Sequence, residues 1–153
     1  MSNFKNHILT ATIFFYITIF LFALYNQPPY IILQWLLATL AGSLFPDIDI
    51  KSKGQKIFYV AFLHVIVVFL LLKNYNAALS ISAFSFMPLF SKHRGLFHNI
   101  WFLSILIFII TKLLVYNFSD YQFLIISNSL FFSMGVITHL WLDWGFMKMF
   151  KFK

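Results

Sequence analysis

Histidine and aspartate, two residue types that bind metal ions, gather at a few places in an otherwise apolar chain. The 153 residues include five histidines and four aspartates, but neither glutamate nor cysteine. Imidazole and carboxylate ligands without thiolate suit zinc, manganese or iron. The residue types therefore predict a divalent-metal site of one to three ions, with zinc favoured. Seven of the nine side chains form four clusters: His7; Asp47 and Asp49; His93 and His98; His139 and Asp143.

The spacing within two clusters supports this chemistry. His139 and Asp143 are four residues apart, so on a helix they share one face. In a span that ends near residue 147, His139 lies about 12 Å below the membrane surface. Asp47 and Asp49 belong to the turn Phe45-Pro46-Asp47-Ile48-Asp49, where proline disrupts the preceding helix. Two carboxylates on such a turn can bind one ion or bridge two.

Each cluster alone also has an ordinary structural interpretation. His7 can be an interfacial residue at a helix start, and Asp47 and Asp49 can cap a helix or pair with nearby lysines. His93 and Arg94 can be charges at the membrane surface. The deep His139–Asp143 pair has little structural purpose in lipid, because ionisable groups at membrane depth are costly.

Two further polar residues are expected outside the site. His64 lies midway along an apolar stretch, where we expect a neutral histidine bonded to a backbone carbonyl or a serine. Asp120 follows Ser119 and is expected to cap the last helix.

The composition places these residues in a membrane. The chain is 61% apolar and 10% charged, whereas soluble domains are about 45–50% apolar and about 25% charged. We expect an all-α integral membrane protein, a single domain over residues 1–153, folded as a compact bundle of about six transmembrane helices, one or two of them short or re-entrant. The apolar stretches are 8–25, 30–45, 57–72, 77–90, 100–116 and 121–147.

The basic residues predict the orientation. Nine of the eleven fall on one face of a six-span bundle and two, Lys73 and Lys112, on the other. Because lysine and arginine favour cytoplasmic loops, both termini and all four clusters are expected on the cytoplasmic side. The net charge of +7 then reflects topology, and no nucleic-acid partner is expected. Abundant Phe, Ile, Lys and Asn suggest an AT-rich genome and hence a bacterial inner membrane.

The clusters, in this order, resemble the YdjM-like family of membrane-bound metal-dependent hydrolases. The matching features are His7, the Pro46-Asp47-Ile48-Asp49 turn, the segment His93-Arg94-Gly95-Leu96-Phe97-His98, and the pair His139 and Asp143. The chain departs from the family pattern at Phe97 and Asn99, where small hydroxyl residues are usual. The resemblance implies a distant similarity to zinc-dependent phospholipase C and related single-strand nucleases.

The leading hypothesis is hydrolysis of a phosphoester in a lipid or lipid-linked substrate at the cytoplasmic leaflet. A metal-activated water would attack, Asp47 or Asp49 would accept its proton, and Arg94 with Lys92 would bind the phosphate. The predicted ligands are His7, Asp47, Asp49, His93, His98, His139 and Asp143. A metal or proton carrier and a non-catalytic, metal-stabilised membrane protein remain alternatives, and the oligomeric state stays open.

Two other enzyme classes fit less well. Ser91, Lys92 and His98 faintly match the motif of phosphohistidine lipid phosphatases, but position 102 is Phe where that motif needs Asp. An intramembrane serine protease would need a G-x-S-x-G motif, which the sequence lacks.

Overall fold

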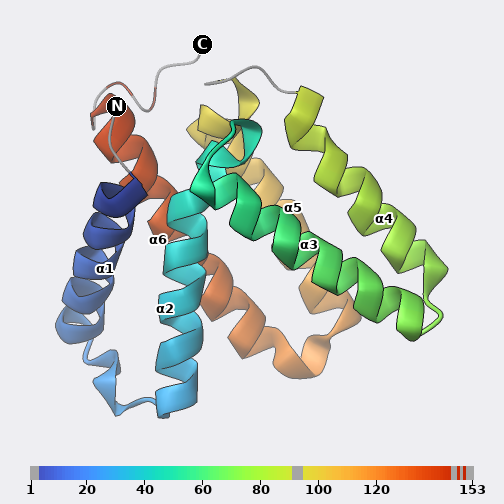
Figure 1. The fold of residues 1–153 in the computed structure, drawn as a ribbon. Helices are drawn as coiled ribbons and strands as arrows, with labels where there is room; N and C mark the ends of the chain where they lie inside the picture. The colour runs from blue at the N-terminus through green and yellow to red at the C-terminus, as the bar shows by residue number, and fades with distance from the viewer. Residues whose placement is uncertain (1–3, 91–94, 146–147, 149, 151–153) are drawn as a thin grey trace.

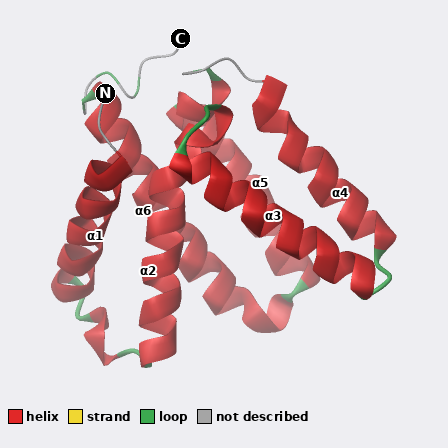
Figure 2. Ribbon diagram, in the orientation of Figure 1, coloured by secondary structure: helices red, strands yellow, loops and turns green. Residues whose placement is uncertain are grey.

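The protein is helical throughout the part of the chain that the structure, a computed structural model, describes: residues 4–90, 95–145, 148 and 150. This part of the chain forms six α-helices, and Figures 1 and 2 show how they are arranged. This confirms the expected all-helical bundle. The helices are α1 (Phe4–Leu21), α2 (Pro29–Leu44), α3 (Lys53–Leu71), α4 (Tyr75–Phe86), α5 (Ile100–Asn117) and α6 (Gln122–Trp144).

Five of the six helices are long and apolar enough to cross a membrane. The exception is α4, which has 12 residues and reaches about 18 Å, less than the hydrocarbon thickness of about 30 Å. It returns alongside α3 to the end of the bundle where α1 begins and α6 ends (Figure 1). The Tyr59 hydroxyl on α3 donates a hydrogen bond to the Ser85 carbonyl, 2.9 Å away. The short fourth element therefore preserves the up-and-down order expected from the sequence.

Helices α2 and α6 form the closely packed centre of the bundle. Gly42 on α2 faces the backbone carbonyl of Phe132, and Gly135 on α6 faces that of Thr39. A Cβ at either glycine would overlap these backbone atoms. Small residues allow such close helix contacts in membranes, where van der Waals packing replaces the hydrophobic effect between helices.

One face of α1 packs against this centre. Its buried residues are His7, Ala11, Phe15 and Ile19, and their spacing of four keeps them on one side of a helix. Phe15 joins a buried cluster in which the rings of Trp35 and Phe131 stack at 4.8 Å. His7 thus continues an apolar stripe, which directs its side chain toward α2 and α6.

A second buried cluster supports the connections at the end of the bundle where α1 begins. Phe45, Ile48, Phe97, Leu103 and Leu140 belong to it. Ile48 and Phe97 are completely buried, so the two connections that carry them are anchored by apolar packing. By contrast, large side chains on the outer faces of α3 and α5 are exposed, as expected of surfaces that contact lipid.

Asp120 does not cap α6, so that expectation is wrong. A 3₁₀ helix, Ser119–Tyr121, precedes α6, and Tyr121 occupies the N-cap position without a side-chain hydrogen bond. The extra turn moves the helix start beyond the reach of the aspartate.

Candidate metal centre

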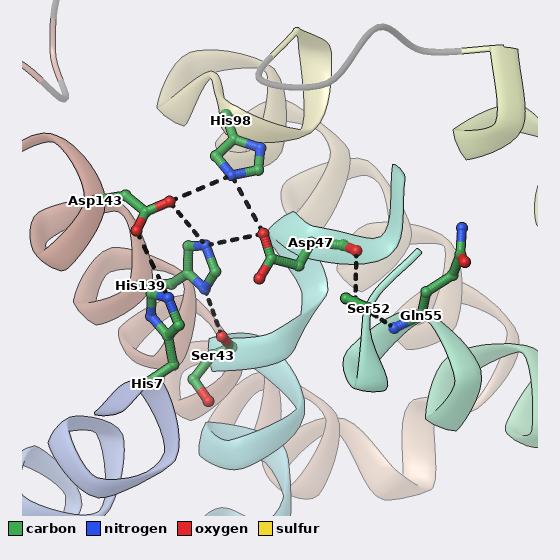
Figure 3. A network of polar contacts seen from close by, with 8 residues as sticks. All are labelled: His7, Ser43, Asp47, Ser52, Gln55, His98, His139 and Asp143. Carbon is green, nitrogen blue, oxygen red and sulfur yellow. Dashed lines mark hydrogen bonds and ion pairs between the residues drawn. The ribbon is translucent and has the colours of Figure 1, made fainter. Parts of the chain in front are cut away.

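Four predicted ligands meet at the end of the bundle where α1 begins and α6 ends. Asp47, His98, His139 and Asp143 each offer one ligand atom, and these atoms all lie within 4.8 Å of one another. Figure 3 shows the side chains converging from the connection after α2, the connection before α5, and the last turns of α6. Residues nearly one hundred positions apart thus share one small polar site.

The spacing between their atoms fits a shared ion better than direct hydrogen bonds. His98 Nε2 lies 3.5 Å from Asp47 Oδ1 and 3.7 Å from Asp143 Oδ2. His139 Nε2 lies 3.6 Å and 3.8 Å from the same oxygens. Hydrogen bonds between such groups are normally about 2.7–3.2 Å long. In a tetrahedral zinc site with bonds of about 2.0–2.1 Å, neighbouring ligand atoms are about 3.3 Å apart.

His139 is held in the orientation that a ligand needs. Its ring is completely buried, and its Nδ1–H donates a hydrogen bond to the Ser43 backbone carbonyl at 2.7 Å. That bond fixes the tautomer in which the Nε2 lone pair faces the carboxylates, a common arrangement around metal-binding histidines. Nε2 has no hydrogen-bond partner among the described residues. A buried acceptor of this kind is costly unless something binds it.

The two carboxylate oxygens of Asp143 face different histidines. Oδ2 points toward His98 and His139, whereas Oδ1 lies 3.6 Å from His7 Nε2. The rings of His7 and His139 stack with centroids 3.8 Å apart. Neither nitrogen of His7 has a hydrogen-bond partner among the described residues. The arrangement can hold one ion in the four-residue group.

The Pro46–Asp49 turn presents Asp47 because its neighbours are anchored. Residues Phe45–Asp49 form a 3₁₀ helix after α2, with Ile48 buried in the apolar cluster. The Ser52 hydroxyl donates to the Asp47 carbonyl at 3.0 Å (Figure 3). The Gln55 side-chain amide donates to the Ile48 carbonyl at 3.0 Å. Asp49 lies outside the four-residue group, although its charge acts on His98.

The two departures from the family pattern have structural roles beside His98. Phe97 is buried against Phe45, with ring centroids 5.8 Å apart. The Asn99 side chain caps α5 by accepting hydrogen bonds from the backbone N–H groups of Trp101 and Phe102. Asparagine and serine are interchangeable as N-caps. Both residues therefore fix the short helix Leu96–His98 that carries the histidine.

His98 lies between α4 and α5, and two carboxylates control its charge. Burial lowers the pKa of His98, but the nearby Asp143 and Asp47 carboxylates favour the protonated ring, outweigh burial and raise the pKa to about 9. Without a bound metal ion, the His98 imidazole is therefore protonated at neutral pH. An ion bound there must displace that proton, because a histidine ligand is neutral.

The remaining predicted residues lie elsewhere. Lys92, His93 and Arg94 fall outside the described residues. His64 is exposed on α3 and bonds through Nδ1 to the Val60 carbonyl at 2.7 Å, as expected. The sequence reasoning missed Ser43, whose contribution is a backbone carbonyl and leaves no residue-type signal. The available hint was Ala38-x-x-x-Gly42, a small-residue spacing typical of close helix contacts.

Comparison with known proteins places the chain in a family. No curated protein and no solved structure matches it. A family model described as the YdjM inner membrane protein matches residues 1–147, and five helices of the chain can span a membrane. Because the match covers nearly the whole sequence, including all four clusters, the chain belongs to the YdjM family of inner membrane proteins.

Proposed function

We propose that this protein is a metal-dependent hydrolase that cleaves a phosphoester of a lipid or lipid-linked substrate at the cytoplasmic face of the membrane. The observation that supports this most is the group of two imidazole nitrogens and two carboxylate oxygens, with all four N–O separations between 3.5 and 3.8 Å. A structural role alone would not require two buried imidazoles and two carboxylates to converge without direct hydrogen-bonding distances.

Asp47, His98, His139 and Asp143 would hold the first ion, and His7 with Asp143 Oδ1 would contribute to a second. Zinc is favoured, with manganese or iron also compatible with these ligands. When bound, such an ion lowers the pKa of a coordinated water and polarises a phosphoryl oxygen. His93 remains a proposed ligand of the same site.

The residues of the chain would supply orientation and proton transfer. Asp47 is the most open of the four ligands, with 23% of its side chain exposed against 7% for Asp143. Substrate and water would therefore enter on the Asp47 side. Asp49 lies outside the ligand group but near enough to influence His98, so we assign it the role of proton acceptor. Arg94 and Lys92 are proposed to bind the phosphate.

Metal content and hydrolysis test the proposal together. We expect purified wild-type protein to contain at least one equivalent of metal and to hydrolyse bis(p-nitrophenyl) phosphate or phospholipid. His139→Ala and Asp143→Ala should lose the first ion and reduce turnover by at least about 100-fold, because even supporting residues around a metal change activity 10–100-fold. His7→Ala should retain that ion and lose any second one.

His64→Ala is the matched control, since this histidine is exposed, bonds to its own helix and does not belong to the ligand group. It should keep both metal and activity. Full metal content in Asp143→Ala would contradict the site. Normal metal binding by a wild-type protein inactive on every phosphoester would contradict the hydrolase and favour a structural metal.

A further inference from the structure

An apolar groove of about 490 Å³ lies between α2, α5 and α6, bordered by α3 and α4. Its volume is within the range of about 300–1,000 Å³ that small-molecule sites occupy. Its walls are almost entirely apolar. Residues that line it include Ala38, Phe45, Phe62, Leu106, Ile110 and Phe132.

The groove begins directly below the metal centre. Phe45 lines it and stands two residues before Asp47. The Phe45 ring packs against Phe58, Phe97 and Phe132 at centroid distances of 5.3, 5.8 and 5.4 Å. Phe132 precedes His139 by seven residues on α6, about 10 Å along the axis. An aromatic layer thus separates the polar site from the groove.

From this layer the groove extends along α5 and α6 toward the turn that joins them. Its lining runs from Leu106 to Leu114 on α5, about 12 Å along the helix. At its far end, Leu114 and Tyr121 are 41% and 60% exposed. Because both helices are long and apolar enough to span a membrane, the groove runs in the direction of lipid chains and opens toward them.

The lining determines which occupant is compatible. Water needs two to four polar partners, whereas the groove offers few: its polar lining residues are Thr111, Asn128 and Ser129, and the Thr111 hydroxyl already donates to that of Ser129. A flexible hydrocarbon chain matches both the lining and the volume, and the bilayer supplies such chains.

We infer that this groove binds one hydrocarbon chain of an amphiphile whose phosphate-bearing head lies at the metal centre. The inference rests on the proposed function and narrows its substrate to a lipid with at least one long chain. The link between head and chain then passes around the aromatic layer at Phe45, and the substrate enters sideways from the bilayer, toward which the groove opens.

Photo-crosslinking tests the groove without requiring turnover. The probe is a phosphatidic acid with a diazirine near the end of one acyl chain, in phosphatidylcholine vesicles containing the metal-loaded protein. We expect labelling at groove residues such as Leu106 and Ile110. Ala38→Phe and Leu106→Trp fill the groove from opposite walls, and each should reduce this labelling by at least about fivefold, the effect of about 1 kcal/mol.

Ala61→Phe is the matched control, because Ala61 is exposed on α3 and does not line the groove. It should label like wild type. Labels spread evenly over the lipid-facing surface, or insensitive to both groove variants, would overturn the inference. Equal labelling by a diacylglycerol with the same diazirine chain would also overturn it, since the phosphate would then contribute nothing.

The experiments can reject the chain-binding site and the proposed hydrolase activity independently of each other. Groove labelling that depends on the phosphate, in a protein that hydrolyses no phosphoester, would retain the binding site and reject the hydrolase. Hydrolysis of bis(p-nitrophenyl) phosphate without groove labelling would retain the hydrolase and reject the groove as its chain-binding site.

Discussion

Asp47 and Asp143 bring two carboxylates close to the same pair of imidazole nitrogens. Ionisable groups are costly at membrane depth unless they are paired or bound to an ion. Protonated His98 partly balances the two carboxylates in the absence of metal. A divalent ion would balance them more fully, while the imidazole returns to its neutral form. Metal binding and deprotonation of His98 are therefore coupled.

This coupling predicts that metal affinity increases with pH. The pKa of His98 is about 9, so between pH 6.5 and 8.5 the metal must displace one proton from it. The apparent affinity for zinc should then rise about tenfold per pH unit. Competition with a chromophoric chelator measures this slope, and His98→Gln should flatten it, whereas His64→Gln should not.

In the metal-free protein, the free energy of unfolding should decrease as pH rises, whereas the metal affinity increases. A histidine whose pKa is raised by folding, from 6.5 to about 9 for His98, contributes its full stabilisation below pH 6.5. That contribution decreases as pH rises through 9.

An apparent zinc affinity that stays constant between pH 6.5 and 8.5 would show that His98 is neutral before the ion binds.

At the scale of helices, the close contact of α2 with α6 positions the centre. Ser43 on α2 receives the hydrogen bond from His139 on α6, and Asp47 follows α2 directly. Gly42 and Gly135 allow the two backbones to approach this closely. A small outward shift of α6 would lengthen the His139–Ser43 bond and separate His139 from Asp47.

Gly135→Ala should therefore weaken both folding and metal binding. Its Cβ would overlap the Thr39 carbonyl and approach the Ser43 nitrogen to 2.7 Å. Forcing such an overlap in a packed interior costs about 1–3 kcal/mol. Denaturant titration in mixed micelles should detect the lost stability, and metal analysis should detect a lower zinc content.

Ile137→Ala is the control on the same helix, since Ile137 is 44% exposed and faces away from α2. It should bind zinc like wild type and lose little stability. If Gly135→Ala matched it in both measurements, the close helix contact would not be what positions His139.

The helices and the site also show which features could be predicted from the sequence and which could not. The apolar runs predicted the helices because a membrane span requires them, and the four-residue spacing put His139 and Asp143 on one face. The sequence does not encode the crossing of α2 and α6 in any single residue type, so the Ser43 carbonyl was missed. Asp120 was misplaced because an added 3₁₀ turn shifted the start of α6.

At the scale of the whole molecule, the lysines near the beginning of α3 and the candidate metal ligands lie at the same end of the bundle. Lys51, Lys53 and Lys56 lie at or near the beginning of α3, beside the metal centre, whereas Lys73 and Lys112 lie toward the other end. The bias of basic residues toward the cytoplasm predicts that the site faces inward. An inward-facing site would act on lipids of the inner leaflet, which is part of the proposed function.

Single cysteines can test this orientation, because the natural sequence has none. Lys51→Cys and Ser119→Cys place exposed thiols at opposite ends of the bundle. In intact spheroplasts a membrane-impermeant maleimide should label Ser119→Cys at once and Lys51→Cys only after permeabilisation. The reverse pattern would put the metal centre on the periplasmic side. The proposed site would then keep its chemistry but meet lipids of the outer leaflet, and its substrate would have to be sought there.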